Sequence, residues 1–216
     1  KARGIKSDLE EKHRCWRLDY MDTLSFHIDV IPCVPNDEYN QQNLYKSMIS
    51  LHEDSQLSLS VSKLSVALTD DRHEKYSEVT SDWLISNPEG YATWFESRMA
   101  LSQQYLLEKR AEIQEIPLYK RKSVLQRTIQ LLKRHRDSIF IDSPDLKPSS
   151  IIITTLSAKA YQGETDITLA MKNIINTIEI YVNYYEPRIP NPVNPHEDFA
   201  DCWKNDKELE KNFKIW

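Results

Sequence analysis

The sequence predicts an α+β fold in which short strands come first and helices follow. Before residue 70, apolar and polar residues alternate over several short stretches, and after residue 87 apolar residues recur at helical spacing. With 216 residues, the chain is long enough for one large or two small domains with a substantial core. We therefore expect a sheet domain over residues 1–86 and a helical domain over residues 87–216.

Strand periodicity is clearest in three stretches of the first third of the chain. Arg14–Tyr20 and Leu24–Val34 both alternate, which predicts neighbouring antiparallel strands, and Leu57–Leu68 alternates again. The charged residues 1–12 are expected to be helical.

From Asn87 the period changes to that of helices. Asn87 can cap a helix and Pro88 suits its first position, which predicts a long helix to about Arg110, followed by a linker near Ile116–Pro117. A second helix is expected over residues 124–136, with a basic polar face. The basic residues around it are Arg121, Lys122, Arg127, Lys133, Arg134 and Arg136.

The last part of the chain predicts one more long helix over Thr165–Tyr185. An ordered Pro-rich loop over Pro187–Pro195 and a short helix containing Trp203 should follow it. The β-branched run Ile151–Thr155 favours a strand by propensity alone. Aromatic residues at helical spacing are expected to fill the core, namely Tyr91, Trp94, Phe95 and Trp203.

Composition excludes several classes of protein. No apolar run approaches the ~20 residues of a membrane helix, and the three widely spaced cysteines suit a reducing compartment. The formal net charge of −5 argues against a long nucleic-acid footprint, and only three glycines occur, so a Gly-rich phosphate loop is excluded. We expect a soluble, cytoplasmic protein without a membrane partner.

A single carboxylate stands out in the predicted strand Phe26–Pro32. His27 and Asp29 are two residues apart and share one face, while Phe26, Ile28 and Val30 would pack into the core behind them. A lone strand aspartate is more often structural, but clustered carboxylates on adjacent strands can hold the two metal ions of nucleotidyl transfer. His27 could tune Asp29, and Asp19 on the neighbouring strand could face the same site or form a surface ion pair.

Several segments, taken in their order along the chain, resemble a known family, although no single segment is diagnostic of it. They are Cys15–Tyr20, Phe26–Pro32, Ser86–Phe95, Leu125–Arg127, Lys133–Asp137, Lys147–Leu156 and Asn191–Pro195. Together they resemble the bacterial cGAS/DncV-like nucleotidyltransferases (CD-NTases) of CBASS anti-phage systems. The resemblance implies a mixed nucleotidyltransferase sheet followed by a helical domain like that of oligoadenylate synthases.

The resemblance also implies roles for particular residues. Asp29 matches the third catalytic carboxylate, which helps to hold Mg²⁺ or Mn²⁺ and orients the attacking ribose hydroxyl. Ser149 and Ser150 match a serine pair at a helix start that contacts the donor triphosphate, so Ile151–Tyr161 is expected to be helical despite its propensity. Exposed N–H groups at a helix N-terminus suit an anion. Lys133 and Arg127 are expected to reach the same phosphates.

The function implied is synthesis of a cyclic di- or oligonucleotide second messenger from NTPs, with release of pyrophosphate. ATP is the expected substrate, other NTPs are further candidate substrates, and a regulatory protein is a candidate partner. A linear oligoadenylate synthase or another template-independent transferase is the alternative within enzymes. If the protein is not an enzyme, the alternative is a non-catalytic nucleotide-binding or interaction module.

The chain departs from the family pattern ahead of Asp29. It has no Gly-Ser pair, and no Asp-x-Asp pair precedes Asp29 to supply the first two metal ligands. Since Lys1 is not an initiator methionine, we expect the chain to be the C-terminal part of such an enzyme and to be inactive by itself.

Overall fold

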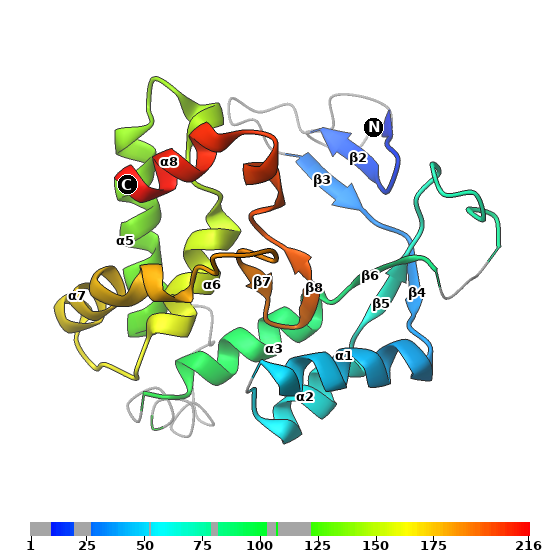
Figure 1. The fold of residues 1–216 in the computed structure, drawn as a ribbon, viewed down its shortest axis with the longest axis horizontal. Coiled ribbons are helices and arrows are strands. Elements are labelled where there is room, and N and C mark those ends of the chain that lie inside the picture. Colours follow the sequence, from blue (N-terminus) through cyan, green and yellow to red (C-terminus); the bar gives the residue numbers. More distant parts are fainter. Residues whose placement is uncertain (1–9, 20–26, 52, 79–81, 103–106, 108–121) are drawn as a thin grey trace. The chain divides into compact units, whose positions relative to one another are not determined.

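The computed structural model describes residues 10–19, 27–51, 53–78, 82–102, 107 and 122–216. The chain forms two compact units, Lys1–Gly90 and Tyr91–Trp216, which are described separately below. The first unit contains short strands and two helices, and the second is mainly helical (Figure 1). The predicted α+β class is therefore confirmed. None of the described helices has the length and apolar character needed to cross a membrane.

The first sheet of unit 1 contains the predicted pair of neighbouring strands. Its strand order is β1 (Glu10–Glu11), β2 (Trp16–Asp19) and β3 (His27–Val30). β2 and β3 are antiparallel, as predicted, with Arg17 opposite Asp29 and Trp16 opposite Val30. The predicted helix over residues 1–12 is wrong at its end, because Glu10 and Glu11 pair with β2; residues 1–9 lie outside the described residues.

A second sheet in unit 1 shows that Leu24–Val34 is not one strand. β3 ends at Val30, and β4 (Cys33–Pro35) begins after Pro32 and pairs in another sheet with β5 (Val66–Leu68) and β6 (Leu84–Ser86). Proline lacks the N–H that a continuous ladder needs, which explains the break. Every pairing among the described strands is antiparallel, so these residues do not display the mixed sheet that was predicted.

Two helices, α1 (Glu38–Ser50) and α2 (Ser55–Ser62), pack against each other in unit 1. The predicted strand over Leu57–Leu68 is wrong for its first half, which forms α2. Asp54 caps this helix by accepting a hydrogen bond from the Leu57 N–H at 2.8 Å, a strong helix start. Val61 is fully buried, while Leu59 is half exposed, so burial follows helical rather than strand periodicity.

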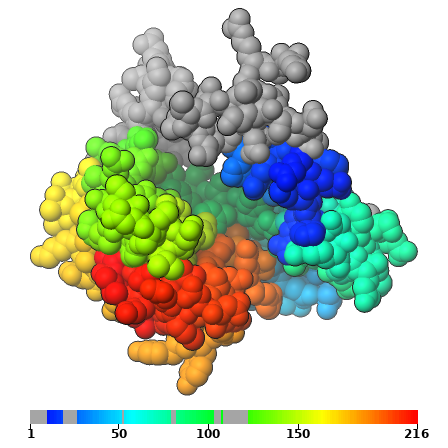
Figure 2. Space-filling view, turned by 90° about the horizontal axis from the view of Figure 1, so that it is seen from above, coloured from blue at the N-terminus to red at the C-terminus, as the bar shows by residue number. Residues whose placement is uncertain are grey.

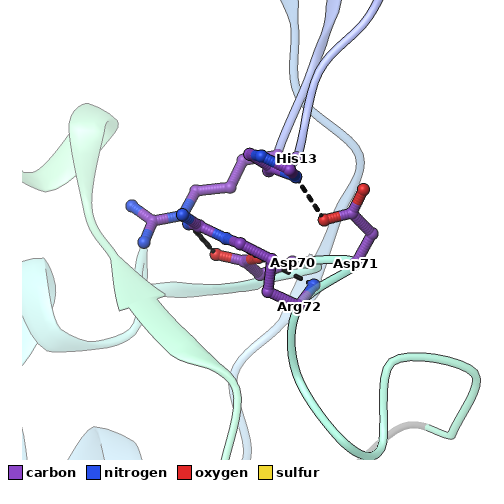
Figure 3. Close-up of polar contacts among 5 residues, drawn as sticks. His13, Asp70, Asp71 and Arg72 are labelled. Carbon is purple, nitrogen blue, oxygen red and sulfur yellow. Dashed lines mark hydrogen bonds and ion pairs between the residues drawn. The ribbon is translucent and has the colours of Figure 1, made fainter.

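A network around Asp70 ties the segment before β2 to the turn after β5. Asp70 accepts hydrogen bonds from Arg14 Nε at 2.6 Å and from Arg72 Nε and Nη2 at 2.8 and 2.7 Å. His13 Nδ1 lies 2.7 Å from Asp71 Oδ1 beside it (Figure 3). The guanidinium of Arg72, followed by that of Arg14, lowers the pKa of Asp70 far below its ordinary value. The network joins the strand pair that carries Asp29 to the second sheet within the same unit.

The helix predicted at Asn87 is present as α3 (Pro88–Met99). Asn87 Oδ1 accepts from the Gly90 N–H at 3.1 Å, and a Cβ on Gly90 would lie 2.3 Å from that oxygen, which explains the glycine. The helix ends at Met99, earlier than the predicted Arg110, and the predicted linker near Ile116 lies outside the described residues.

Two central helices of unit 2, α5 (Val124–Ile139) and α6 (Ser150–Ala160), confirm the predictions made for them. Ser123 and Gln126 form a reciprocal capping box at the start of α5. In α6 the β-branched run is helical because tertiary burial outweighs propensity. Its inward side chains, Ile152, Ile153 and Leu156, are at most 1% exposed.

The end of unit 2 differs most from the predicted elements. The helix expected over Thr165–Tyr185 is shorter, and the Pro-rich loop forms a two-stranded hairpin. The elements are the 3-10 helix η3 (Pro144–Leu146), α7 (Ile167–Thr177), η4 (Ile178–Tyr181), β7 (Pro190–Asn191), β8 (Asn194–Asp198), η5 (Asp201–Lys204) and α8 (Lys207–Ile215). Trp203 lies in η5, as predicted for a short helix, but α8 was not predicted as a separate element.

The core of unit 2 joins α6 to the C-terminal elements. Its buried members are Ile152, Leu156, Ile189, Ala200, Trp203 and Phe213. The Trp203 and Phe213 rings have centroids 5.4 Å apart. Asn212 of α8 donates to the Leu146 carbonyl at 3.1 Å, and Figure 2 shows the C-terminal segment in red beside the yellow-green residues near 140–150. The predicted core role of Trp94 and Trp203 is confirmed by their burial.

Candidate functional site

The strand pair β2–β3 places Asp29 in a bidentate ion pair with Arg17. Arg17 Nε donates to Asp29 Oδ1 at 2.9 Å and Arg17 Nη2 donates to Oδ2 at 3.1 Å. The pair follows from the register, because the two residues are directly opposite and their side chains share one face of the sheet. Both side chains are about one-third exposed. The hydrogen bonds from Arg17 lower the pKa of Asp29 below its ordinary value, with smaller help from His27.

His27 lies on the predicted face with Asp29. Its Nε2 is 3.8 Å from Asp29 Oδ2, which supports the expectation that the two side chains sit together. Sequence reasoning missed Arg17, although its position opposite Asp29 follows once the two strands are aligned. The structure does not describe the Asp19 side chain, so its predicted role stays a prediction.

The opposite face of β2–β3 is not the buried core that was predicted. Ile28 is 39% exposed and Val30 is 50% exposed, and Trp16 on β2 is also exposed. The alternation along the strand is present, but the described residues leave its apolar side partly open to solvent. Phe26, the third predicted core residue, lies outside the described residues.

The described residues do not by themselves form a two-metal site. In this part of the chain, no group of three or more His, Cys, Asp or Glu side chains is placed to hold a metal ion. Both oxygens of Asp29 already accept hydrogen bonds from Arg17. A divalent ion at Asp29 would need further carboxylates as ligands, and it would share Asp29 with the guanidinium or displace it.

A second cluster of charged residues lies in unit 2, where α5 meets the start of α6. Its central residue is Arg136, which is 5% exposed. Arg136 Nη1 donates to the Pro148 carbonyl and to Ser150 Oγ, both at 2.9 Å, and Nε and Nη2 donate to Asp137 Oδ1. Lys147 Nζ lies 3.4 Å from the same Asp137 oxygen.

The burial of Arg136 corrects the prediction that it lies on the basic polar face of this helix. Arg136 continues the buried stripe of Ile129 and Leu132 at helical spacing. The sequence did contain a signal for this buried arginine. Helical periodicity places Arg136 at an inward position, and a buried charge must find hydrogen-bond partners.

The predicted serine pair lies at the start of α6. Ser149 is the N-cap residue, but its side chain makes no capping hydrogen bond. Ser150 is the first helical residue, and both serines are exposed. The first turn of α6 therefore has N–H groups without a side-chain cap, which is an arrangement that can accept an anion.

Lys133 is adjacent to this cluster, and Arg127 is more distant on the same helix. Lys133 lies one turn before Arg136 and is half-buried; burial, with repulsion from Arg136, lowers the pKa of its ammonium group. Arg127 is exposed and lies six residues earlier than Lys133, about 9 Å along the helix axis. Phosphate binding by Lys133, Arg127, Ser149 and Ser150 stays a prediction.

Comparison with known proteins identifies a relative over nearly the whole chain. The chain is 34% identical over 210 residues to a c-di-GMP synthase of Roseivirga ehrenbergii. The match covers 94% of this chain and 48% of that protein, so the chain spans about half the length of its relative. No protein-family model matches the chain.

Comparison with solved structures supports the fold. The structure of the Bradyrhizobium diazoefficiens CD-NTase CdnG in complex with GTP aligns with a TM-score of 0.55, 16% sequence identity, and coverage of 99% of this chain and 62% of that chain.

The relative and the fold together define a nucleotidyltransferase homologue. More particularly, the chain is homologous to part of a c-di-GMP synthase and its fold is similar to that of a CD-NTase, so the resemblance seen in the sequence is confirmed.

Proposed function

We propose that this chain is part of an enzyme that makes cyclic di-GMP, or a related cyclic oligonucleotide, from NTPs with release of pyrophosphate. The observation that carries the proposal is 34% identity to a c-di-GMP synthase across 94% of the chain. GTP is the proposed substrate, in keeping with the product of that relative and with the GTP in the CdnG structure. The product would serve as a second messenger in anti-phage defence.

Each unit has a distinct role in this proposal. Residues 1–86 are the proposed C-terminal part of the nucleotidyltransferase domain, where Asp29 serves as a metal-binding carboxylate for Mg²⁺ or Mn²⁺. Residues 87–216 are the proposed helical domain, where Lys133, Ser149 and Ser150, assisted by Arg127, bind the triphosphate. The uncapped first turn of α6 and the half-buried Lys133 support the second role.

The 216 residues alone should bind nucleotide without converting it. One carboxylate, held by Arg17, cannot organise two divalent ions for in-line displacement. We expect GTP binding by isothermal titration calorimetry, and no cyclic or linear oligonucleotide by chromatography after incubation with GTP and Mg²⁺ or Mn²⁺. Product from a clean preparation would show that the chain needs no further carboxylates.

The catalytic role is tested in a chimera with the Roseivirga enzyme. These residues replace the matching 210-residue region of that enzyme, and the chimera is assayed for c-di-GMP from GTP. Activity is expected, and Asp29→Asn should abolish it, whereas Asp82→Asn, an exposed aspartate of the same unit, should not. A folded chimera that makes linear oligonucleotide would support the alternative transferase, and one that binds GTP without turnover would support the non-catalytic module.

A further inference from the structure

The guanidinium of Arg136 makes the hydroxyl oxygen of Ser150, at the start of α6, a hydrogen-bond acceptor. An arginine side chain has no acceptor, so in the 2.9 Å contact with Arg136 Nη1 the Ser150 Oγ must be the acceptor. The hydrogen of the Ser150 hydroxyl is then free to point elsewhere. Among the residues that the structure describes, none accepts it.

The same guanidinium also holds the backbone that leads into α6. It donates to the carbonyl of Pro148, which is two residues before Ser150. One buried side chain therefore hydrogen-bonds to the residues on both sides of the N-cap residue Ser149. Because Arg136 is anchored in the buried stripe of α5, the first turn of α6 is held in one position without an internal side-chain cap.

Asp137 is the counter-charge of this cluster. It is about half exposed and accepts from Arg136 Nε and Nη2 at 3.0 and 2.7 Å, with Lys147 Nζ at 3.4 Å. Arg136, followed by Lys147, lowers the pKa of Asp137, so this carboxylate is ionised at neutral pH. An anion at the first turn of α6 would be attracted by Arg136 and Lys147 and repelled by Asp137.

From these contacts we propose that Arg136 is a positioning residue for the triphosphate site, and that Asp137 is its competing counter-charge. Arg136 presents the Ser150 hydroxyl and the N–H groups of the α6 first turn to phosphate oxygens without contacting the nucleotide itself. The inference rests on the proposed phosphate site, but it assigns the arrangement of that site to a residue outside the set predicted to bind phosphate.

A double-mutant cycle tests whether Arg136 acts through Ser150. Binding of inorganic tripolyphosphate to the 216-residue chain is measured by calorimetry for wild type, Arg136→Gln, Ser150→Ala and the double variant. Loss of a hydrogen bond to a charged group weakens binding by about tenfold, so each single variant should lose about that much. The double variant should be no more than about twofold weaker than the weaker single variant, because the two changes remove one interaction.

Matched variants separate positioning from general charge and from folding. Arg134→Gln removes the same charge from an exposed position of α5 and should leave affinity within about twofold. Arg136→Lys should restore part of the lost affinity, and Asp137→Asn should tighten binding by about threefold through loss of repulsion. Circular dichroism and thermal melting monitor the fold of each variant.

The outcomes distinguish failure of the inference from failure of the proposed function. If wild type does not bind tripolyphosphate, the proposed phosphate site fails. If wild type binds but the losses from Arg136→Gln and Ser150→Ala add fully, or Asp137→Asn weakens binding, the positioning role is overturned while the site stands. If Arg136→Gln does not fold, Arg136→Lys takes its place in the double-mutant cycle with Ser150→Ala. That cycle and the effect of Asp137→Asn then decide whether the positioning role stands.

Discussion

The strand pair β2–β3 and the helix pair α5–α6 each hold an arginine in a network of oxygen acceptors, but in opposite surroundings. Arg17 and its partner Asp29 are each about one-third exposed, whereas Arg136 is 5% exposed and bonds to Pro148 and Ser150 as well as to a carboxylate. The first ion pair can exchange with solvent and ions, while the second is built into the packing of its unit.

The comparison teaches that these two regions, each within its own unit, differ in rigidity. Behind Arg136, α6 buries Ile152 and Leu156 against the core of unit 2, while the apolar face of β2–β3 leaves Ile28 and Val30 exposed. A phosphate site gains from a preorganised frame, because binding then costs less ordering. In the metal-binding role proposed for Asp29, this carboxylate would gain from a partner that ions can displace.

The largest expected difference is in core truncation. Leu156→Ala should lower the free energy of unfolding by about 3 kcal/mol, because the side chain is fully buried. Ile28→Ala should cost less than about 1 kcal/mol, because much of that side chain is already in water. Urea unfolding followed by circular dichroism measures both, and equal costs would contradict the contrast between the two regions.

A pH-dependent effect comes next and concerns the partly buried ion pair of Arg188 with Glu210. Arg188 Nη2 donates to Glu210 Oε1 at 2.8 Å, and Arg188, with Lys214, lowers the pKa of Glu210 to about 2. The folded pKa lies below the unfolded one, so this stabilisation is full above about pH 4.5 and is lost as the pH falls towards 2.

Substitution of the carboxylate tests this pH dependence. Glu210→Gln should cost about 1 to 2 kcal/mol at neutral pH and reduce the loss of stability in acid. Thermal melting between pH 2 and 7 measures it, with Glu208→Gln, an exposed neighbour in α8, as control. An unchanged acid dependence in Glu210→Gln would rule out this ion pair as its source.

Helix caps provide a matched comparison within unit 2. Ser123→Ala removes a capping box from α5 and should cost about 1 kcal/mol of stability. Ser149→Ala removes no capping hydrogen bond from α6 and should leave stability within about 0.5 kcal/mol. It should nevertheless weaken tripolyphosphate binding. Loss of stability without loss of binding in Ser149→Ala would assign that serine to the fold instead.

For Arg17→Met, only a small effect on stability is expected, together with a change in a pKa. Since both side chains of the ion pair with Asp29 remain in contact with solvent, its removal should cost little stability. The pKa of Asp29 should rise towards its ordinary value, because Arg17 is the main cause of its lowering. Carboxyl NMR titration measures the shift, and an unchanged pKa would mean that another group holds Asp29 ionised.

Local patterns were sufficient for much of the fold. The antiparallel partners β2 and β3, the capped start of α3 and the amphipathic α5 follow from alternation, from an Asn-Pro start and from helical spacing. The first half of Leu57–Leu68 was predicted wrongly, because alternating leucine and serine fit a strand as well as a helix. The N-cap at Asp54 and the packing against α1 stabilise the helical form, α2.

The candidate site was predictable only in part. The shared face of His27 and Asp29 follows from their spacing of two, and the helical form of α6 followed from the family resemblance against β propensity. The roles of Asp29, Lys133, Ser149 and Ser150 await the experiments above. Arg17 and Arg136 were missed as partners, because their bonds join segments 12 and 14 residues apart in the chain.

The sequence by itself determined the α+β class, the order of strands before helices and the family to which the chain is related, because periodicity, caps and ordered segments are local properties. Tertiary structure alone decided which charges are buried. Periodicity can mark Arg136 as an inward position of α5, but only the approach of Pro148 and Ser150 provides the oxygens that satisfy a buried guanidinium. Burial and hydrogen-bond satisfaction depend on every segment that packs nearby, and those segments are distant in sequence.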